Sequence, residues 1–307
     1  MISLLGNVAV LIGMARIKHD LSNSVRLYYS IIAFSELVIV SSYFFVGDFL
    51  ETGISYLVSG GSLHPILTYD ATIWSCKLIN ALWMGPDFLV GLTLVCLGIE
   101  RIIAVTWPFR AKTILTLRNS VILETTVNLI VDGSFLPFLC IDYTIVPQYG
   151  CWYDFSLSFT QFYIFYEESI PLFSSFISFG ISIYLIVKMM LLAAQRNRIS
   201  SIGGISALEL SNVATLTLLD VAHLIVYIPD GLFYCMYSLT VVSPGALNSD
   251  LSYIIYRLAD LCNELTIVPH ALTFFILFYR SEAFRNALFG KCLKRSTNRH
   301  ITIPRAG

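Results

Sequence analysis

The stretch CKLINALWMGPDFLVGLTLVCLGIERIIAVTWP, residues 76–108, decides the fold of this chain. It is largely apolar between Cys76 and the Glu100-Arg101 pair, and Pro108 follows Arg101 by seven positions. Because proline cannot continue a helix, we expect the helix to end at this proline. The 25 positions from Cys76 to Arg101 amount to roughly 37 Å of α-helix, and a hydrocarbon core is only roughly 30 Å thick. The stretch therefore predicts a helix that crosses a membrane.

The composition extends this prediction to the whole chain. Only 13% of the residues are charged and 56% are hydrophobic, whereas an ordinary soluble domain carries about 25% charge. A helix satisfies its own backbone groups in lipid, so we expect each long apolar stretch to be helical. The apolar stretches cover residues 2–16, 25–47, 75–105, 119–141, 161–192, 210–237 and 252–279. We therefore predict an all-α membrane protein, a seven-transmembrane helix bundle in a lipid bilayer, with residues 1–307 as one domain.

The basic residues predict the orientation of this bundle. Of the 19 Lys and Arg residues, 17 follow the first, third, fifth or seventh stretch, and positive charge marks the cytoplasmic side. The two exceptions, Lys77 and Arg257, lie near the opposite ends of their stretches. The amino terminus should therefore be outside, and residues 281–307 should form a cytoplasmic tail that starts with a short amphipathic eighth helix.

The region 76–108 resembles the third helix of the rhodopsin-like (class A) G protein-coupled receptors, which have an entry cysteine, an acid-Arg pair and a loop proline at this spacing. Other motifs of that family are matched in chain order by Gly6-Asn7, Glu36, the kink proline Pro171 and the hinge proline Pro229. Tyr227 takes the place of the hinge tryptophan, and the family's NPxxY motif is absent. The chain is thus similar to a divergent, invertebrate-type member of this family.

The resemblance implies a receptor function. The expected protein lies in the plasma membrane, binds an extracellular ligand and activates a cytoplasmic heterotrimeric G protein. It would be a neuropeptide or chemosensory receptor, with neither an enzymatic activity nor a nucleic-acid partner.

The family also implies a disulfide and a switch. Its entry cysteine is joined to the second extracellular loop, which implies a disulfide between Cys76 and Cys151. Its third-helix arginine implies that Arg101 pairs with Glu100 and Glu209 at rest and is released to the G protein. For Glu209 a second interpretation stays open, namely a solvated acid favoured by the dipole at the start of its helix.

Glu36 is an ionisable residue in mid-span, which is by default functional. The resemblance implies that Glu36 and Asn7 form an ion and activation site that holds a sodium ion. The alternative is that Glu36 shares a proton or hydrogen bonds with Asn7. In the tail, Cys292 between basic residues is either a palmitoylation site or an unmodified thiol.

Acidic residues in the outer halves of the helices indicate the ligand. Asp87, Glu167 and Asp230 should face the interior, and Glu264 could join them. Excess negative charge in a dry pocket attracts a cation, which favours a basic peptide or another cationic ligand. The alternative is that these carboxyls are protonated or paired with tyrosines. The expected ligand-binding residues are Trp83, Asp87, Tyr163, Glu167, Tyr227, Asp230 and Tyr234.

Other classes of protein fit the sequence less well. A membrane enzyme would need a convergent nucleophile-base or metal set, and it is disfavoured because neither an H-E-x-x-H motif nor clustered His and Cys is evident. A seven-helix transporter or channel without G protein coupling is the alternative that hydropathy leaves open. It does not account for the joint spacing of Cys76, Arg101, Pro108, Pro171 and Pro229.

The first helix should be short. Residues 1–16 give about 24 Å of helix, whereas a span needs about 20 residues. We therefore expect this helix to begin at or near Met1, and we expect its outer part to be missing.

Overall fold

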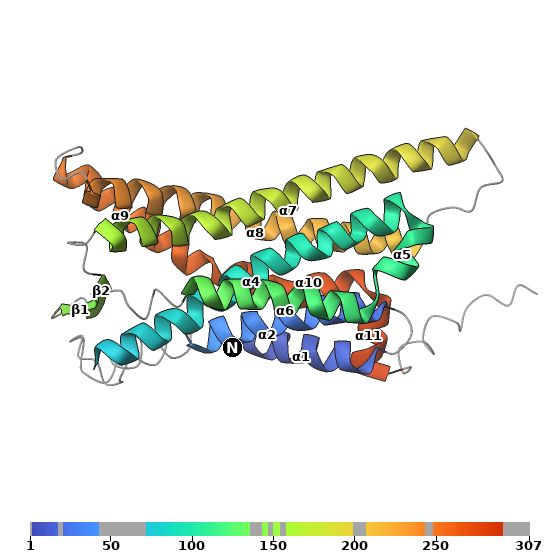
Figure 1. The fold of residues 1–307 in the computed structure, drawn as a ribbon, viewed down its shortest axis with the longest axis horizontal. Coiled ribbons are helices and arrows are strands. Elements are labelled where there is room, and N and C mark those ends of the chain that lie inside the picture. Colours follow the sequence, from blue (N-terminus) through green and yellow to red (C-terminus); the bar gives the residue numbers. More distant parts are fainter. Residues whose placement is uncertain are drawn as a thin grey trace, which may run out of the picture.

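The computed structural model describes residues 2–17, 21–42, 72–135, 143–146, 150–153, 158–198, 207–242 and 248–290. Long helices lie side by side in an elongated bundle, with a pair of short strands at one end (Figure 1). Because lipid offers no hydrogen bonds to a backbone, a bundle of helices is the arrangement that these apolar stretches favour.

Each predicted apolar stretch is helical where the structure describes it. The long helices are α1 (Ile2–Arg16), α2 (Asn23–Ile39), α4 (Ile73–Thr106), α6 (Leu117–Phe135), α7 (Ser158–Arg198) and α8 (Ala207–Val242), followed by α9 (Ser249–Leu265) and α10 (Ile267–Arg280). Two short helices are α5 (Pro108–Ile114) and α11 (Glu282–Phe289). The expected start of the first helix near Met1 and the helix after residue 281 are both confirmed.

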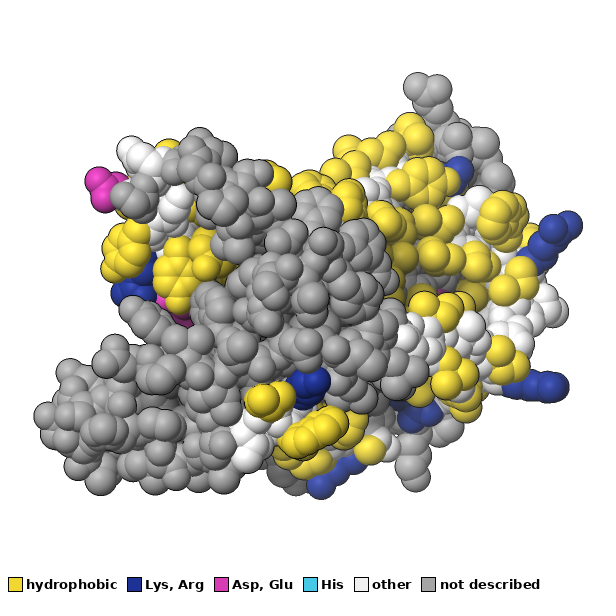
Figure 2. All heavy atoms as spheres, turned by 60° about the vertical axis from the view of Figure 1, so that its left-hand side comes forward, with side chains coloured by type: hydrophobic (Ala, Val, Ile, Leu, Met, Phe, Trp, Pro, Cys, Tyr) yellow, Lys and Arg dark blue, Asp and Glu magenta, His cyan; other side chains and the backbone are white. Residues whose placement is uncertain are grey.

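The protein is a multi-pass helical membrane protein. Among the described residues, 5 helical segments are long and apolar enough to cross a membrane, and there are 6 if α5 and α6, bent by 68°, count as one. The helix α1 is a shorter apolar helix. On the face shown in Figure 2, hydrophobic side chains gather on the right-hand part, where several Lys and Arg side chains also project. The exposed apolar side chains, such as Phe173 at 63% and Ile225 at 67%, suit contact with lipid.

Local side-chain contacts define several helix starts. The hydroxyl of Ser22 accepts the Val25 amide at 3.3 Å to start α2, and Ser281 accepts the Phe284 amide at 3.2 Å to start α11. Thr72 and Ser75 form a reciprocal capping box at the start of α4. Such caps satisfy amides that would otherwise lack partners in the first turn of a helix.

The seventh apolar stretch differs from the prediction because it is two helices. The α9 helix ends at Leu265, and the Thr266 amide bonds the Asn263 carbonyl at 3.0 Å, a tighter turn than an α-helix makes. The next helix, α10, contains Pro269 in its first turn, where the absent amide costs nothing. The α4 helix, in contrast, continues through Pro86.

Small residues let neighbouring helices approach closely. At Gly98 on α4, an added Cβ would lie 2.7 Å from Cγ2 of Ile181 on α7. At Gly6 on α1, an added Cβ would lie 2.9 Å from the Cβ of Phe274 on α10. Van der Waals contact through small residues is a main source of helix association in membranes. These contacts hold α4 against α7 and α1 against α10, around a buried apolar core.

Polar contacts reinforce the packing inside the bundle. On α8, Asp220 accepts hydrogen bonds from Ser178, at 2.6 Å, and from Ser182, both on α7. On α6, Glu124 is 2% exposed and accepts a 3.4 Å bond from Thr93 on α4. Buried acids thus link neighbouring helices.

The strands β1 (Tyr143–Val146) and β2 (Gly150–Tyr153) form an antiparallel pair in which Cys151 lies opposite Ile145. The strand β1 contacts α4. The pair lies at the end of the bundle opposite to α5 (Figure 1).

Candidate functional site

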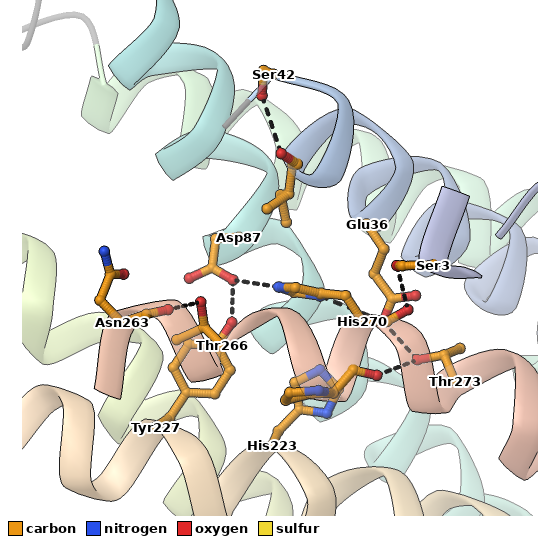
Figure 3. Close-up of polar contacts among 12 residues, drawn as sticks. Ser3, Glu36, Ser42, Asp87, His223, Tyr227, Asn263, Thr266, His270 and Thr273 are labelled. Carbon is orange, nitrogen blue, oxygen red and sulfur yellow. Dashed lines mark hydrogen bonds and ion pairs between the residues drawn. The ribbon is translucent and has the colours of Figure 1, made fainter. Parts of the chain in front are cut away.

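Four helices bring ionisable and hydroxyl side chains together inside the bundle (Figure 3). The α2, α4, α8 and α10 helices contribute Glu36, Asp87, His223, Tyr227, His270 and Thr273. Ionisable residues inside a membrane protein are costly and mark functional sites by default. This group, which we call the polar centre, is therefore the candidate functional site.

Glu36 is the centre of the first group of contacts. Its carboxyl is fully buried, and its Oε1 accepts a 2.6 Å hydrogen bond from the hydroxyl of Thr273. The Nδ1 atom of His270 lies 3.7 Å from the same oxygen. The Oε2 atom of Glu36 has no hydrogen-bond partner. The Oε1 atom is thus held by residues of α10, while the Oε2 atom is free to accept a hydrogen bond or to bind an ion.

His223 approaches this carboxyl from α8. Its Nδ1 lies 2.8 Å from the carbonyl oxygen of Leu219, and because a carbonyl only accepts, Nδ1 must carry the proton. The ring is stacked on Tyr227 with centroids 5.9 Å apart, and the His270 ring meets it edge-on at 6.2 Å. The Nε2 atom of His223 has no hydrogen-bond partner.

Asp87 closes the polar centre on the side of α4. Its Oδ1 accepts a hydrogen bond from the hydroxyl of Tyr227 and lies 3.9 Å from Nε2 of His270. Asp230, one turn of α8 beyond Tyr227, is 7% exposed, and its Oδ1 has no hydrogen-bond partner. For Asp87, the structure thus has the alternative arrangement named in the sequence analysis, in which the acid is paired with a tyrosine.

The alternative in which Glu36 hydrogen-bonds Asn7 is wrong, whereas a sodium site at these two residues stays a prediction. The Asn7 amide nitrogen donates to the His270 carbonyl at 3.2 Å and to the Ser3 hydroxyl at 3.4 Å, while its Oδ1 has no partner. Asn7 therefore fastens α1 to the backbone of α10. The side chains that surround the Glu36 carboxyl are those of Thr273, His270 and His223 instead.

The expected ion pair at the end of α4 is present. Arg101 Nη2 lies 3.1 Å from Glu100 Oε1, and both side chains are largely buried. The same Glu100 oxygen accepts a 2.6 Å hydrogen bond from Ser24 on α2, a contact that the sequence did not reveal. The Glu209 side chain lies outside the described part of the structure, so its pairing with Arg101 stays a prediction.

The expected ligand-binding residues are only partly described. Asp87, Tyr227 and Asp230 lie in the interior as predicted, and Tyr234 is half-buried. The expectation for Glu264 is wrong because its side chain is exposed. Some expected site residues fall outside the described part of the structure, either as side chains or as whole residues. They are Cys76, Trp83, Cys151, Tyr163, Glu167, Pro171 and Cys292. Pro229 lies inside α8, as a hinge proline would.

A separate groove lies away from the polar centre. It has a volume of about 630 Å³ and is lined by α1, α2, α4 and α6, with Phe34 and Leu82 at its exposed edge. Pro86 also lines the groove, and the next residue of α4, Asp87, belongs to the polar centre. The groove is mainly apolar and contains none of the acids predicted for ligand binding.

Sequence reasoning missed the two histidines of the polar centre. His223 and His270 are ionisable residues inside apolar stretches, which is the signal that singled out Glu36. Their convergence depends on how α8 and α10 pack, because 47 positions separate them. Histidines that are not clustered in the sequence are therefore brought together in space with Glu36.

No protein-family model matches this chain, and no curated protein matches it either.

Proposed function

We propose that this protein is a rhodopsin-like G protein-coupled receptor of the plasma membrane. In this proposal seven helices cross the membrane, with α9 and α10 as one span, and α11 lies along the cytoplasmic surface. An extracellular ligand, a basic peptide or another cation, binds between the helices, and the signal passes to a heterotrimeric G protein. The protein itself catalyses no reaction.

The Glu100-Arg101 pair is the observation that carries this proposal. Arg101 is 11% exposed at the end of α4, beside a carboxylate that Ser24 also holds. An arginine that pairs with one partner in the resting conformation can pair with another in the active conformation. It can therefore act as a switch between the two conformations.

The ends of the bundle support the proposed direction of signalling. The β1–β2 pair, which contains Cys151, contacts α4 and lies at the end opposite to α5. At the α5 end, α11 packs against α1 and α10. In our proposal the strand pair covers the ligand entrance and the α5 end meets the G protein. The carboxyl groups of Asp87 and Asp230 lie inside the bundle, where each offers oxygen acceptors to a cationic ligand.

The test is ligand-independent signalling in cells that carry a G protein biosensor. If Glu209 helps to hold Arg101, Glu209→Gln should raise basal signalling, and Arg101→Ala should abolish it. Glu282→Gln is the control, because it removes an exposed acid at the same end. All variants must be compared at equal surface expression. Absence of G protein activation under any condition, including a screen of basic and neutral peptides with a promiscuous G protein, would contradict the proposal.

A transporter or channel is the second candidate, and one feature favours it. The seventh stretch breaks at Thr266, next to a centre that holds Glu36 and two histidines. Broken helices beside ionisable residues are typical of ion-coupled transporters. Proton flux into liposomes containing the purified protein distinguishes the two candidates, since a receptor should produce none.

A further inference from the structure

Three side chains of the polar centre each have a buried atom without a hydrogen-bond partner, namely Glu36 Oε2, His223 Nε2 and His270 Nδ1. One ligand atom from each residue can be chosen so that all three lie within 4.8 Å of one another. A buried polar atom without a partner is destabilising. Three such side chains that converge within this distance favour a bound species that the protein itself does not supply.

In Glu36 and His223 the other polar atom of the side chain has a hydrogen-bond partner. The Leu219 carbonyl accepts a hydrogen bond from His223 Nδ1, and Thr273 donates to Glu36 Oε1. Asp87 lies 3.9 Å from Nε2 of His270. In His223 the Nε2 atom is thereby left with its lone pair, and a proton on Nε2 of His270, toward Asp87, would leave Nδ1 of that ring in the same state. Metal-binding histidines are oriented in this way, by a carbonyl or a carboxylate on the far nitrogen.

We propose that Glu36, His223 and His270 bind a divalent transition-metal ion, with Zn²⁺ as the probe. Two imidazole nitrogens and one carboxylate oxygen are a ligand set of zinc sites, whereas sodium and magnesium prefer oxygen ligands. Ligand atoms around a tetrahedral zinc ion are about 3.3 Å apart. Glu36 Oε1, the oxygen that Thr273 holds, lies 3.7 Å from His270 Nδ1, so the Glu36 carboxyl is already close to that nitrogen. Small side-chain rotations bring the set together, and the fourth position stays open.

The proposed ion joins α2, α8 and α10, and this has a mechanical consequence. These helices carry one ligand each, so the ion would link α8 to both α2 and α10. Because a ligand stabilises the conformation that binds it, the metal should favour the packing described here. This proposal does not depend on the receptor function, since it concerns binding to the purified chain.

The first experiment measures binding to the unmodified protein. The full chain, purified in detergent with a tag that lacks histidine and stripped with a chelator, is titrated separately with Zn²⁺, Mg²⁺ and Na⁺. We expect one Zn²⁺ per chain and a higher unfolding temperature with zinc only. X-ray absorption at the zinc edge should show two imidazole ligands. No bound zinc, stabilisation by sodium or magnesium alone, or a zinc shell without imidazole would overturn the proposal.

The second experiment assigns the ligands by substitution. Glu36→Gln and His270→Asn should each weaken zinc binding by at least about 100-fold, and Thr273→Val should weaken it by about 10-fold through the orientation of Glu36. Asp220→Asn is the matched control, because it neutralises another buried carboxyl and should leave zinc affinity unchanged. Size-exclusion chromatography checks that each variant is folded. Equal zinc affinity in folded Glu36→Gln and Asp220→Asn would refute the assignment.

Discussion

Ser24 on α2 donates a 2.6 Å hydrogen bond to Glu100 on α4, across 76 positions of sequence. The bond holds the carboxylate that also pairs with Arg101, and the second oxygen of Glu100 has no partner. Glu100 is only 3% exposed, so water cannot replace a lost bond. The position of Arg101 thus depends on contacts from two helices.

Ser24→Ala should therefore destabilise the protein. A hydrogen bond to a charged group contributes about 1.5–3 kcal/mol, and the substitution leaves Glu100 with Arg101 alone. Thermal unfolding of the purified protein in detergent measures the effect. Ser30→Ala is the control, because that hydroxyl bonds only the Arg26 carbonyl of its own helix, at 2.7 Å. Equal unfolding temperatures for the two variants would contradict this role of Ser24.

Tyr227→Phe should loosen the polar centre. The Tyr227 hydroxyl donates to Asp87, and the ring itself is nearly buried. Phenylalanine keeps the packing but leaves the carboxyl without its donor, at a cost of about 1–3 kcal/mol. Tyr279→Phe, at a position that is 75% exposed, should change stability little. Thermal unfolding in detergent measures both variants. If the Tyr227→Phe protein were as stable as the Tyr279→Phe protein, the hydrogen bond to Asp87 would not contribute to stability.

Two glycines on neighbouring helices should respond oppositely to alanine. At Gly98 the new methyl would lie 2.7 Å from Ile181, and such overpacking costs about 1–3 kcal/mol. At Gly180 nothing lies within 4 Å, so alanine should stabilise α7 by about 0.5–1 kcal/mol through its lower backbone entropy. The difference between the two unfolding temperatures tests the close approach of α4 and α7. If both variants gained stability, that approach would be wrong.

The predicted disulfide between Cys76 and Cys151 can be tested by mass spectrometry of unreduced peptides. Cys151 lies on β2, and its partner strand β1 contacts α4, which begins just before Cys76. A linked peptide is expected, and closing a loop of this length stabilises the fold by roughly 4 kcal/mol. Cys96 and Cys262 are free thiols and serve as internal controls. Alkylation of all four cysteines before reduction would rule out the disulfide.

The sequence by itself determined where the helices are. Apart from the turn at Thr266, each apolar stretch is helical where the structure describes it, because a backbone in lipid must satisfy its hydrogen bonds within its own segment. The strong local signal of Pro108 set a boundary that tertiary contacts did not move. The break at Thr266 escaped prediction, since average hydropathy continues across it.

The tertiary structure alone decided which side chains meet. The Glu100-Arg101 pair could be predicted because its members are adjacent in sequence, but the bond from Ser24 could not. Glu36 was correctly singled out as buried, yet its carboxyl faces Thr273 and two histidines rather than Asn7. Each residue turns the helix by about 100°, so a small rotation or shift of one helix changes every partner across an interface. Such rotations are set by the packing of all the helices together, and no single stretch of sequence contains them.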